Sequence, residues 1–252
     1  MKILYTICFD KSRDKDRPYF NNIHDVITNC LISVVKQMDK KDEIIFFLDG
    51  EDPLNTISTI CKKYNVNYIT KSFDINSEKT LNKGCLMAKE CISYIDTNIT
   101  SEHELIYLCE DDYLHFNGSL NMIKEFLFKY PSYFCHPIDY PNLYENDEPQ
   151  YHTNQYSEII TTNNRHWRSI KNSTMTFAFT KRMFNVPLNH LVFKSIIEST
   201  TDSVYDSHWQ NLLFVFDKCF SPIPSLVSHI EYGCEPYCSN EATANCISSL
   251  QR

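Results

Sequence analysis

Three acidic residues follow a short apolar run in the stretch LIYLCEDDY, residues 105–113. The apolar run has the length of a buried strand, and Glu110, Asp111 and Asp112 come directly after it. Carboxylates gathered at one point repel one another unless a cation neutralises them. The pattern therefore fits a hard divalent cation that one or two carboxylates hold and substrate phosphates complete. The alternative is a solvated acidic loop at the end of a strand.

The segments before these acids alternate between strand-like and helix-like patterns. Apolar and β-rich runs predict strands at residues 2–9, 44–50, 66–72 and 105–109. Helical spacing of apolar residues predicts helices at 23–38, 54–64 and 79–95. This alternation predicts an α/β fold with a parallel sheet and right-handed crossovers.

Acids stand at three of the predicted strand ends. Asp10 and Asp49 end the first two strands, and the fourth strand ends in the acid triple. Because side chains alternate along an extended chain, we expect Glu110 and Asp112 on one face and Asp111 on the other. Ligands of parallel sheets bind beyond the carboxyl ends of the strands, so the convergence favours a ligand site.

The regular alternation of predicted strands and helices stops in the second part of the chain. Predicted elements are a helix at 117–130, strands at 133–135 and 173–180, helices at 189–199 and 206–216, and a strand-like run within 221–230. Residues 136–156 are rich in Pro, Tyr, Asn and Asp and predict an ordered functional loop. We expect one domain with a nucleotide-binding first half, a variable second half and a polar, mobile tail.

Composition excludes several classes of protein. The 252 residues carry a formal net charge of -8, which argues against a nucleic-acid partner attracted by a general basic field. No run approaches the ~18 consecutive apolar residues of a membrane span. The apolar stretch at the N-terminus, which reaches Asp10, is too short for a signal peptide. The 11 cysteines lack paired spacing, which is typical of free thiols in a reducing compartment, so we expect a cytoplasmic protein.

Glycine-based phosphate binding is also excluded. The chain has only four glycines and neither of the common glycine-rich phosphate loops. A bound phosphate would therefore need a metal or basic side chains.

Several segments resemble the motifs of GT-A fold glycosyltransferases. LNKGCLMAKE at 81–90, followed by a strand and EDD, is similar to the family's N-x-G-x-x-x-A helix and D-x-D-type motif. FLDG at 47–50 is similar to its second strand end, and SPIPSLVSHIE at 221–231 resembles its late P-S-L-V-x-H strand. The resemblance implies a GT-A (Rossmann-like) fold, with a mostly parallel central sheet flanked by helices and a smaller acceptor-side subregion. It divides the chain into a nucleotide-sugar-binding half at 1–116, an acceptor-binding half at 117–235 and the tail at 236–252.

The resemblance also implies roles for matching residues. Asp112 and His229 would hold Mn²⁺ or Mg²⁺, and Asp49 would hydrogen-bond the base of the donor. Imidazole beside oxygen ligands suits Mn²⁺ slightly better; the alternative for His229 is a surface or satisfied core histidine. The full set of expected donor-binding residues is Asp10, Asp49, Asn82, Gly84, Glu110, Asp111 and Arg168.

Inverting transfer needs a base to take the proton of the acceptor hydroxyl. Asp206, just before an apolar-periodic helix, resembles the helix-start base of inverting GT-A enzymes. An ordinary N-cap is the alternative, and Asp202 and His208 are rival bases.

Aromatic and basic side chains gather in the centre of the chain. Tyr140 and Trp167 are predicted to stack on an acceptor sugar, and Arg168 or Lys171 to meet a phosphate. The alternatives are core packing for the aromatic rings and a helix cap for Arg168.

Taken together, these patterns predict a metal-dependent glycosyltransferase that moves a sugar from a nucleotide-diphosphate sugar to a glycan or other hydroxyl acceptor, with inversion. The alternatives are a nucleotidyltransferase and a non-catalytic nucleotide-sugar-binding protein of the same fold.

Overall fold

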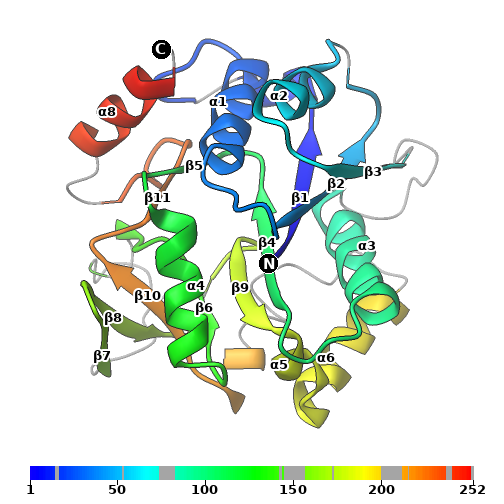
Figure 1. Ribbon diagram of the computed structural model, residues 1–252, viewed down its shortest axis with the longest axis vertical. Coiled ribbons are helices and arrows are strands. Elements are labelled where there is room, and N and C mark those ends of the chain that lie inside the picture. Colours follow the sequence, from blue (N-terminus) through cyan, green and yellow to red (C-terminus); the bar gives the residue numbers. More distant parts are fainter. Residues whose placement is uncertain are drawn as a thin grey trace.

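The protein is described from a computed structural model, shown in Figure 1. The residues that the structure describes are 1–14, 17–52, 54–73, 83–141, 144, 157–171, 173–199, 212–214, 216–236 and 240–250.

A nine-stranded sheet runs through these residues in the order β3-β2-β1-β4-β9-β6-β10-β8-β7. Its strands are β1 Lys2–Cys8, β2 Glu43–Asp49, β3 Tyr68–Phe73, β4 Leu105–Glu110, β6 Phe134–Cys135, β7 Ile159–Thr162, β8 Arg165–Ile170, β9 Phe177–Thr180 and β10 Cys219–Ile223. The first four strands pair in parallel, which confirms the prediction for this half. The second half makes the sheet mixed, because β9 pairs antiparallel with β4, and β8 with β10 and β7.

Helices cover both faces of the sheet (Figure 1). They are α1 Ile23–Val35, α2 Thr56–Tyr64, α3 Lys83–Asn98, α4 Ser119–Lys129, α5 Lys181–Asn185, α6 Pro187–Glu198 and α8 Asn240–Leu250. Alternate residues of β1 point to opposite cores: Tyr5 packs in the core with α1, α2 and α4, and Leu4 packs in the core with α3, α5 and α6. Burial on both faces explains why the parallel strands are almost continuously apolar.

The C-terminal residues differ from the expected mobile tail. Residues Asn240–Leu250 form α8, which packs against α1. Leu250 is buried in the core of that face, and Cys246 and Ile247 pack against it. The polar composition hid these three apolar contacts, in which Cys246 and Ile247 lie about one helical turn before Leu250.

A small antiparallel ribbon stands beside the main sheet. It joins β5, Tyr113–His115, to β11, Val227–His229, with His229 opposite Tyr113. Residues of the acid stretch are thereby placed next to residues more than a hundred positions later.

The last residue of β5, His115, is a buried neutral histidine. His115 is 1% exposed; its Nδ1 donates to the Tyr113 carbonyl oxygen at 2.9 Å, and its Nε2 accepts from the Tyr107 hydroxyl at 2.7 Å. Both ring nitrogens are satisfied without a second proton, and burial lowers the pKa of His115 to about 4.

We predict that His115 makes the protein less stable on mild acidification. The unfolded chain takes up the proton near pH 6.5 and the folded chain only near pH 4, so stability is lost as the pH falls between these values. Denaturant titrations at several pH values should show a difference between wild type and His115→Gln that changes by up to about 1.4 kcal/mol per pH unit. Parallel pH profiles of the two proteins would contradict the prediction.

Candidate active site at the strand ends

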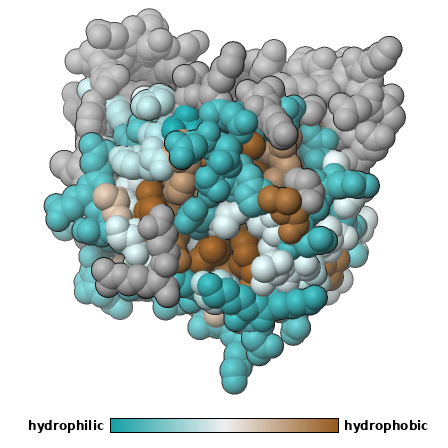
Figure 2. Space-filling model, turned by 90° about the horizontal axis from the view of Figure 1, so that it is seen from above, coloured by the Kyte–Doolittle hydropathy of each residue, from teal (hydrophilic) through white to brown (hydrophobic). Residues whose placement is uncertain are grey.

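The carboxyl ends of β1, β2 and β4 meet, as the sequence predicted. Cys8 lies opposite Asp49 in the β1–β2 register, and its Sγ donates to Asp49 Oδ2 at 3.2 Å. On the other side of β1, the Cys8 backbone N–H donates to Asp111 Oδ2 at 2.8 Å. Asp10 follows β1 directly, and its carbonyl oxygen accepts from the Arg13 N–H at 3.0 Å. Figure 2 looks down on the molecule from the top of Figure 1, where β1 ends, and shows apolar side chains bordered by hydrophilic ones.

Two arginines of the loop after β1 neutralise the buried acids. The Arg13 guanidinium donates to both oxygens of Asp111, at 2.8 and 2.9 Å, and to Asp112 Oδ2 at 3.1 Å. Arg17 donates to Asp112 Oδ2 and to the Ile230 carbonyl oxygen, each at 2.9 Å. Neither arginine was predicted as a site residue from the sequence. Their position after the first strand end, where ligands of parallel sheets bind, is the signal that could have indicated them.

The acids do not alternate as predicted. β4 ends at Glu110, and Asp111 and Asp112 lie in the turn to β5, where they share Arg13. Glu110 instead accepts from the Thr176 hydroxyl at 3.0 Å, beside β9. The alternation expected of a strand fails here because β4 ends at Glu110, directly before Asp111 and Asp112.

His229 is brought to the acids by the ribbon. The Ile230 N–H donates to the Asp112 carbonyl oxygen at 2.8 Å, and the His229 ring stacks on Tyr113 with centroids 4.5 Å apart. Its Nε2 lies 3.5 Å from Asp112 Oδ1. The structure therefore joins the two residues predicted to bind a metal.

Charge coupling across this contact shifts both groups. Burial alone would raise the pKa of Asp112, but the charges of His229, Arg13 and Arg17 lower it below its usual value. Burial would lower the pKa of His229, and its contacts with Tyr140 and Asp112 raise it well above the usual value instead.

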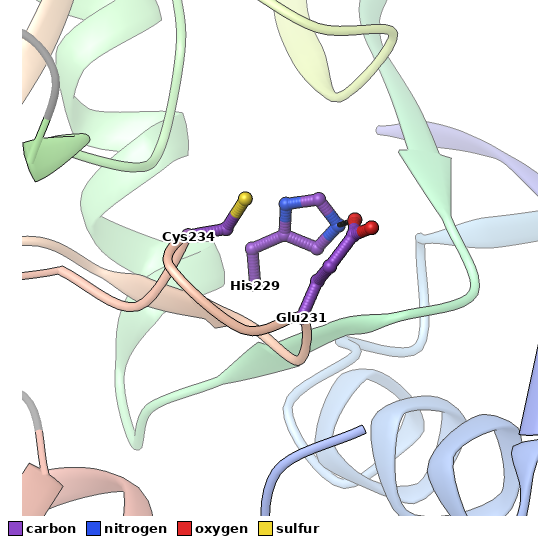
Figure 3. A group of neighbouring side chains, drawn as sticks. All are labelled: His229, Glu231 and Cys234. Carbon is purple, nitrogen blue, oxygen red and sulfur yellow. Dashed lines mark ion pairs between the residues drawn. The ribbon is translucent and has the colours of Figure 1, made fainter. Parts of the chain in front are cut away.

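A second carboxylate completes the contact around His229 (Figure 3). Glu231 Oε2 lies 3.3 Å from Nε2 of His229, and its side chain is 48% exposed. Cys234 is near the same ring but on its other side in this view. Glu231 lies within the segment that resembles the late GT-A strand, but its contact with His229 was not predicted from the sequence.

The donor set of this cluster fits a divalent cation. Adjacent ligands of an octahedral ion with bonds of ~2.1 Å are about 3 Å apart, close to the distances from Nε2 to the two carboxylate oxygens. Oδ2 of Asp112 is held by arginine, which leaves Oδ1 facing His229. Asp112 and Glu231 thus each offer an oxygen beside the imidazole of His229, a mixed set that suits Mn²⁺. Cys234 is the third residue whose ligand atom lies within 4.8 Å of those of His229 and Glu231.

Trp167 is a core residue, and the predicted stacking on an acceptor sugar is wrong. Its side chain is fully buried, its ring lies 4.4 Å from that of Phe126, and its Nε1 donates to Thr162 Oγ1 at 3.1 Å. β8 places it on the face covered by α4, so core packing, the alternative left open by the sequence, is the correct interpretation.

Arg168 and Tyr140 are engaged within the protein. Arg168 Nη2 lies 2.8 Å from Asp139 Oδ1, and the guanidinium covers the Tyr144 ring at 4.2 Å. The Tyr140 hydroxyl contacts His229 Nδ1 at 2.9 Å. Their predicted contacts with donor phosphate and acceptor stay predictions.

The remaining predicted residues fall at or beyond the edge of the described chain. Gly84 lies in the first turn of α3. Residues outside the described ranges are Asn82, Asp202, Asp206 and His208.

Comparison with known proteins places the fold. No family model matches the chain, and no curated protein matches its sequence. Solved structures do match over almost the whole chain, and they show that it has the fold shared by GT-A glycosyltransferases and nucleotidyltransferases. None of the helices within the described ranges combines the length and apolar character needed to cross a membrane.

Three of the similar structures represent both enzyme classes. The galactosyltransferase LgtC, in complex with donor and acceptor sugar analogs, has a TM-score of 0.54 at 9% identity, over 100% of this chain and 97% of that one. A putative glucose-1-phosphate thymidylyltransferase from Bacillus anthracis has a TM-score of 0.54 at 11% identity, over 99% and 95%. TarS 1-349 from S. aureus has a TM-score of 0.50 at 12% identity; the match covers 99% of this chain but 64% of TarS, less than two thirds.

We predict strong coupling between Arg13 and Asp111. Removing one partner leaves a buried charge, so Arg13→Met and Asp111→Asn should each lower the unfolding free energy by about 3–5 kcal/mol. In a double-mutant cycle by urea denaturation, the double variant should lose much less unfolding free energy than the sum of the two single losses. The matched control is the more exposed pair Lys2–Glu43 at the amino ends of β1 and β2, with coupling below about 1 kcal/mol. Additive effects of Arg13→Met and Asp111→Asn would contradict the prediction.

Proposed function

We propose that the protein is a metal-dependent glycosyltransferase that moves a sugar from a nucleotide-diphosphate sugar to a hydroxyl acceptor with inversion. The observation that carries the proposal is the convergence of Asp112, His229 and Glu231 beyond the parallel strand ends. The fold comparison supports it, because LgtC, a galactosyltransferase, shares this fold over the whole chain.

The cluster has a clear chemical use in such a transfer. When a sugar leaves a nucleoside diphosphate, negative charge grows on the leaving phosphate. A divalent cation held by Asp112 Oδ1, His229 Nε2 and Glu231 would supply the charge that stabilises this leaving group. Arg13 and Arg17 both donate to Oδ2 of Asp112 and lower the pKa of this carboxyl, so that Oδ1 stays directed at the cluster.

The donor nucleotide is proposed to lie along the ends of β1 and β2. Asp49 would accept a hydrogen bond from the base, and Asp10 lies at the neighbouring strand end. Asp49 also accepts from the Cys8 thiol, which orients one of its two carboxylate oxygens. The acceptor, a glycan or another hydroxyl compound, is proposed to be deprotonated by Asp206, with Asp202 and His208 as the rival bases.

A nucleotidyltransferase is the second candidate. The thymidylyltransferase matches with the same TM-score, 0.54, as the galactosyltransferase. Arg13 and Arg17 also place two cations immediately after β1, where a triphosphate would need them in the absence of a glycine-rich loop. The two reactions differ in their product, since sugar transfer releases nucleoside diphosphate and nucleotidyl transfer releases pyrophosphate.

We predict Mn²⁺-dependent binding of a nucleoside diphosphate. UDP, GDP and their sugars should raise the melting temperature in the presence of Mn²⁺ and not without it. Asp112→Asn should abolish this shift because it removes a charged ligand, whereas Glu43→Gln, at the opposite end of the sheet, should keep it. Nucleoside diphosphate and pyrophosphate are measured in the same samples.

Each outcome decides between the candidates. Pyrophosphate release from a nucleoside triphosphate and sugar phosphate would favour the nucleotidyltransferase. Binding without any turnover would favour a non-catalytic protein. If no nucleoside diphosphate stabilises the protein with Mn²⁺ or Mg²⁺, the proposal is wrong.

A further inference from the structure

A chain of three hydroxyl groups leads from Thr174 to His229. Thr174 Oγ1 lies 2.7 Å from the Tyr113 hydroxyl, which also bonds the Tyr140 hydroxyl. The Tyr140 hydroxyl in turn lies 2.9 Å from His229 Nδ1. We call Thr174, Tyr113 and Tyr140 the hydroxyl chain.

The middle of the hydroxyl chain is buried, and its two ends, Thr174 and Tyr140, are half-buried. Tyr113 is fully buried, and its ring stacks on the His229 ring at an interplanar angle of 11°. The Tyr140 ring packs edge-on against His229 from another side, with centroids 6.0 Å apart. Burial raises the pKa of Tyr140 to about 12, so its hydroxyl keeps its proton at neutral pH.

The direction of the hydrogen bonds in the hydroxyl chain depends on which nitrogen of the His229 imidazole carries a proton. Each hydroxyl donates one hydrogen bond, so the bonds run in one direction or in the other. If Nδ1 donates to Tyr140, then Tyr140 donates to Tyr113 and Tyr113 to Thr174, and Nε2 of a neutral His229 carries a lone pair. If the order is reversed, Nδ1 accepts, and Nε2 carries a proton toward Asp112 and Glu231.

Only the first order leaves a neutral His229 able to bind a cation. A proton on Nε2 faces two carboxylate oxygens, at 3.5 and 3.3 Å, and so fits the state without a cation. A lone pair on Nε2 is what a cation ligand must offer, and a ligating histidine usually donates its other N–H to a fixed partner.

We propose that Tyr140 is a positioning residue that accepts the Nδ1 proton of His229 and thereby presents Nε2 to a divalent cation. This inference rests on the proposed metal dependence. It assigns a role to Tyr140 that differs from sugar stacking and requires no contact between Tyr140 and substrate.

The test compares Tyr140→Phe with wild type in Mn²⁺ titrations followed by electron paramagnetic resonance, with UDP present. Loss of the Nδ1 partner should weaken Mn²⁺ binding about 10–100-fold. The matched control is Tyr107→Phe, which removes the same hydroxyl from a buried tyrosine–histidine pair outside the cluster, 2.7 Å from His115 Nε2. This control should bind Mn²⁺ like wild type. Thr174→Val, at the far end of the hydroxyl chain, should weaken binding by a smaller factor.

A second measurement shows directly which ring nitrogen of His229 carries a proton. In ¹⁵N spectra with diamagnetic Mg²⁺, His229 of wild type should carry a single proton, on Nδ1. Tyr140→Phe should lose the pure Nδ1–H form.

The outcomes separate this inference from the proposed function. Unchanged affinity and tautomer in Tyr140→Phe and Thr174→Val, with binding lost in Asp112→Asn, would overturn the role of Tyr140 alone. No cation binding to the wild type would overturn both.

Discussion

The burial of Asp111 and Asp112 is the constraint on which the rest of the site depends. Two carboxylates taken out of water are destabilising by several kcal/mol each unless opposite charges stand beside them. Arg13 and Arg17 supply two positive charges, and the Cys8 N–H adds a hydrogen bond from the adjacent strand. The loop after β1 must therefore fold back over the end of the sheet, and this geometry fixes which oxygen of Asp112 faces His229.

The same fold serves two kinds of chemistry among the similar structures, so the parallel half alone does not define a reaction. The candidate ligands of this chain come from the turn before β5, from the β5–β11 ribbon and from the turn that follows it. The pairing of His229 with Tyr113 sets the imidazole between a buried carboxylate and an exposed one. The other ring nitrogen, Nδ1, lies beside the Tyr140 hydroxyl, so the protonation of the ring must match this hydrogen bond.

The sequence predicts the first four strands because their pattern is local: apolar runs such as IIFFLDG are buried on both faces. It also predicts that Asp112 and His229 meet, through the resemblance and not through spacing. It does not predict Arg13, Arg17 or Glu231, because a charged residue in a polar loop has the same local pattern whether it pairs with a buried acid or with water. Trp167 shows the opposite difficulty, since an aromatic ring in a polar segment fits both a core and a sugar platform. β8 decides between them only through its partners β7 and β10.

The bond from Arg17 to the Ile230 carbonyl oxygen has a consequence for how the protein folds. It ties the loop after the first strand to the segment after the last one, across 213 residues of sequence. Contacts of such separation form late, because a long loop must close before they contribute. His229 and Glu231 belong to the same late segment, so a chain that has not closed this loop cannot bring them to Asp112. The acquisition of a competent site and the completion of the fold are then one event, and partly folded chains have no ordered place for a substrate.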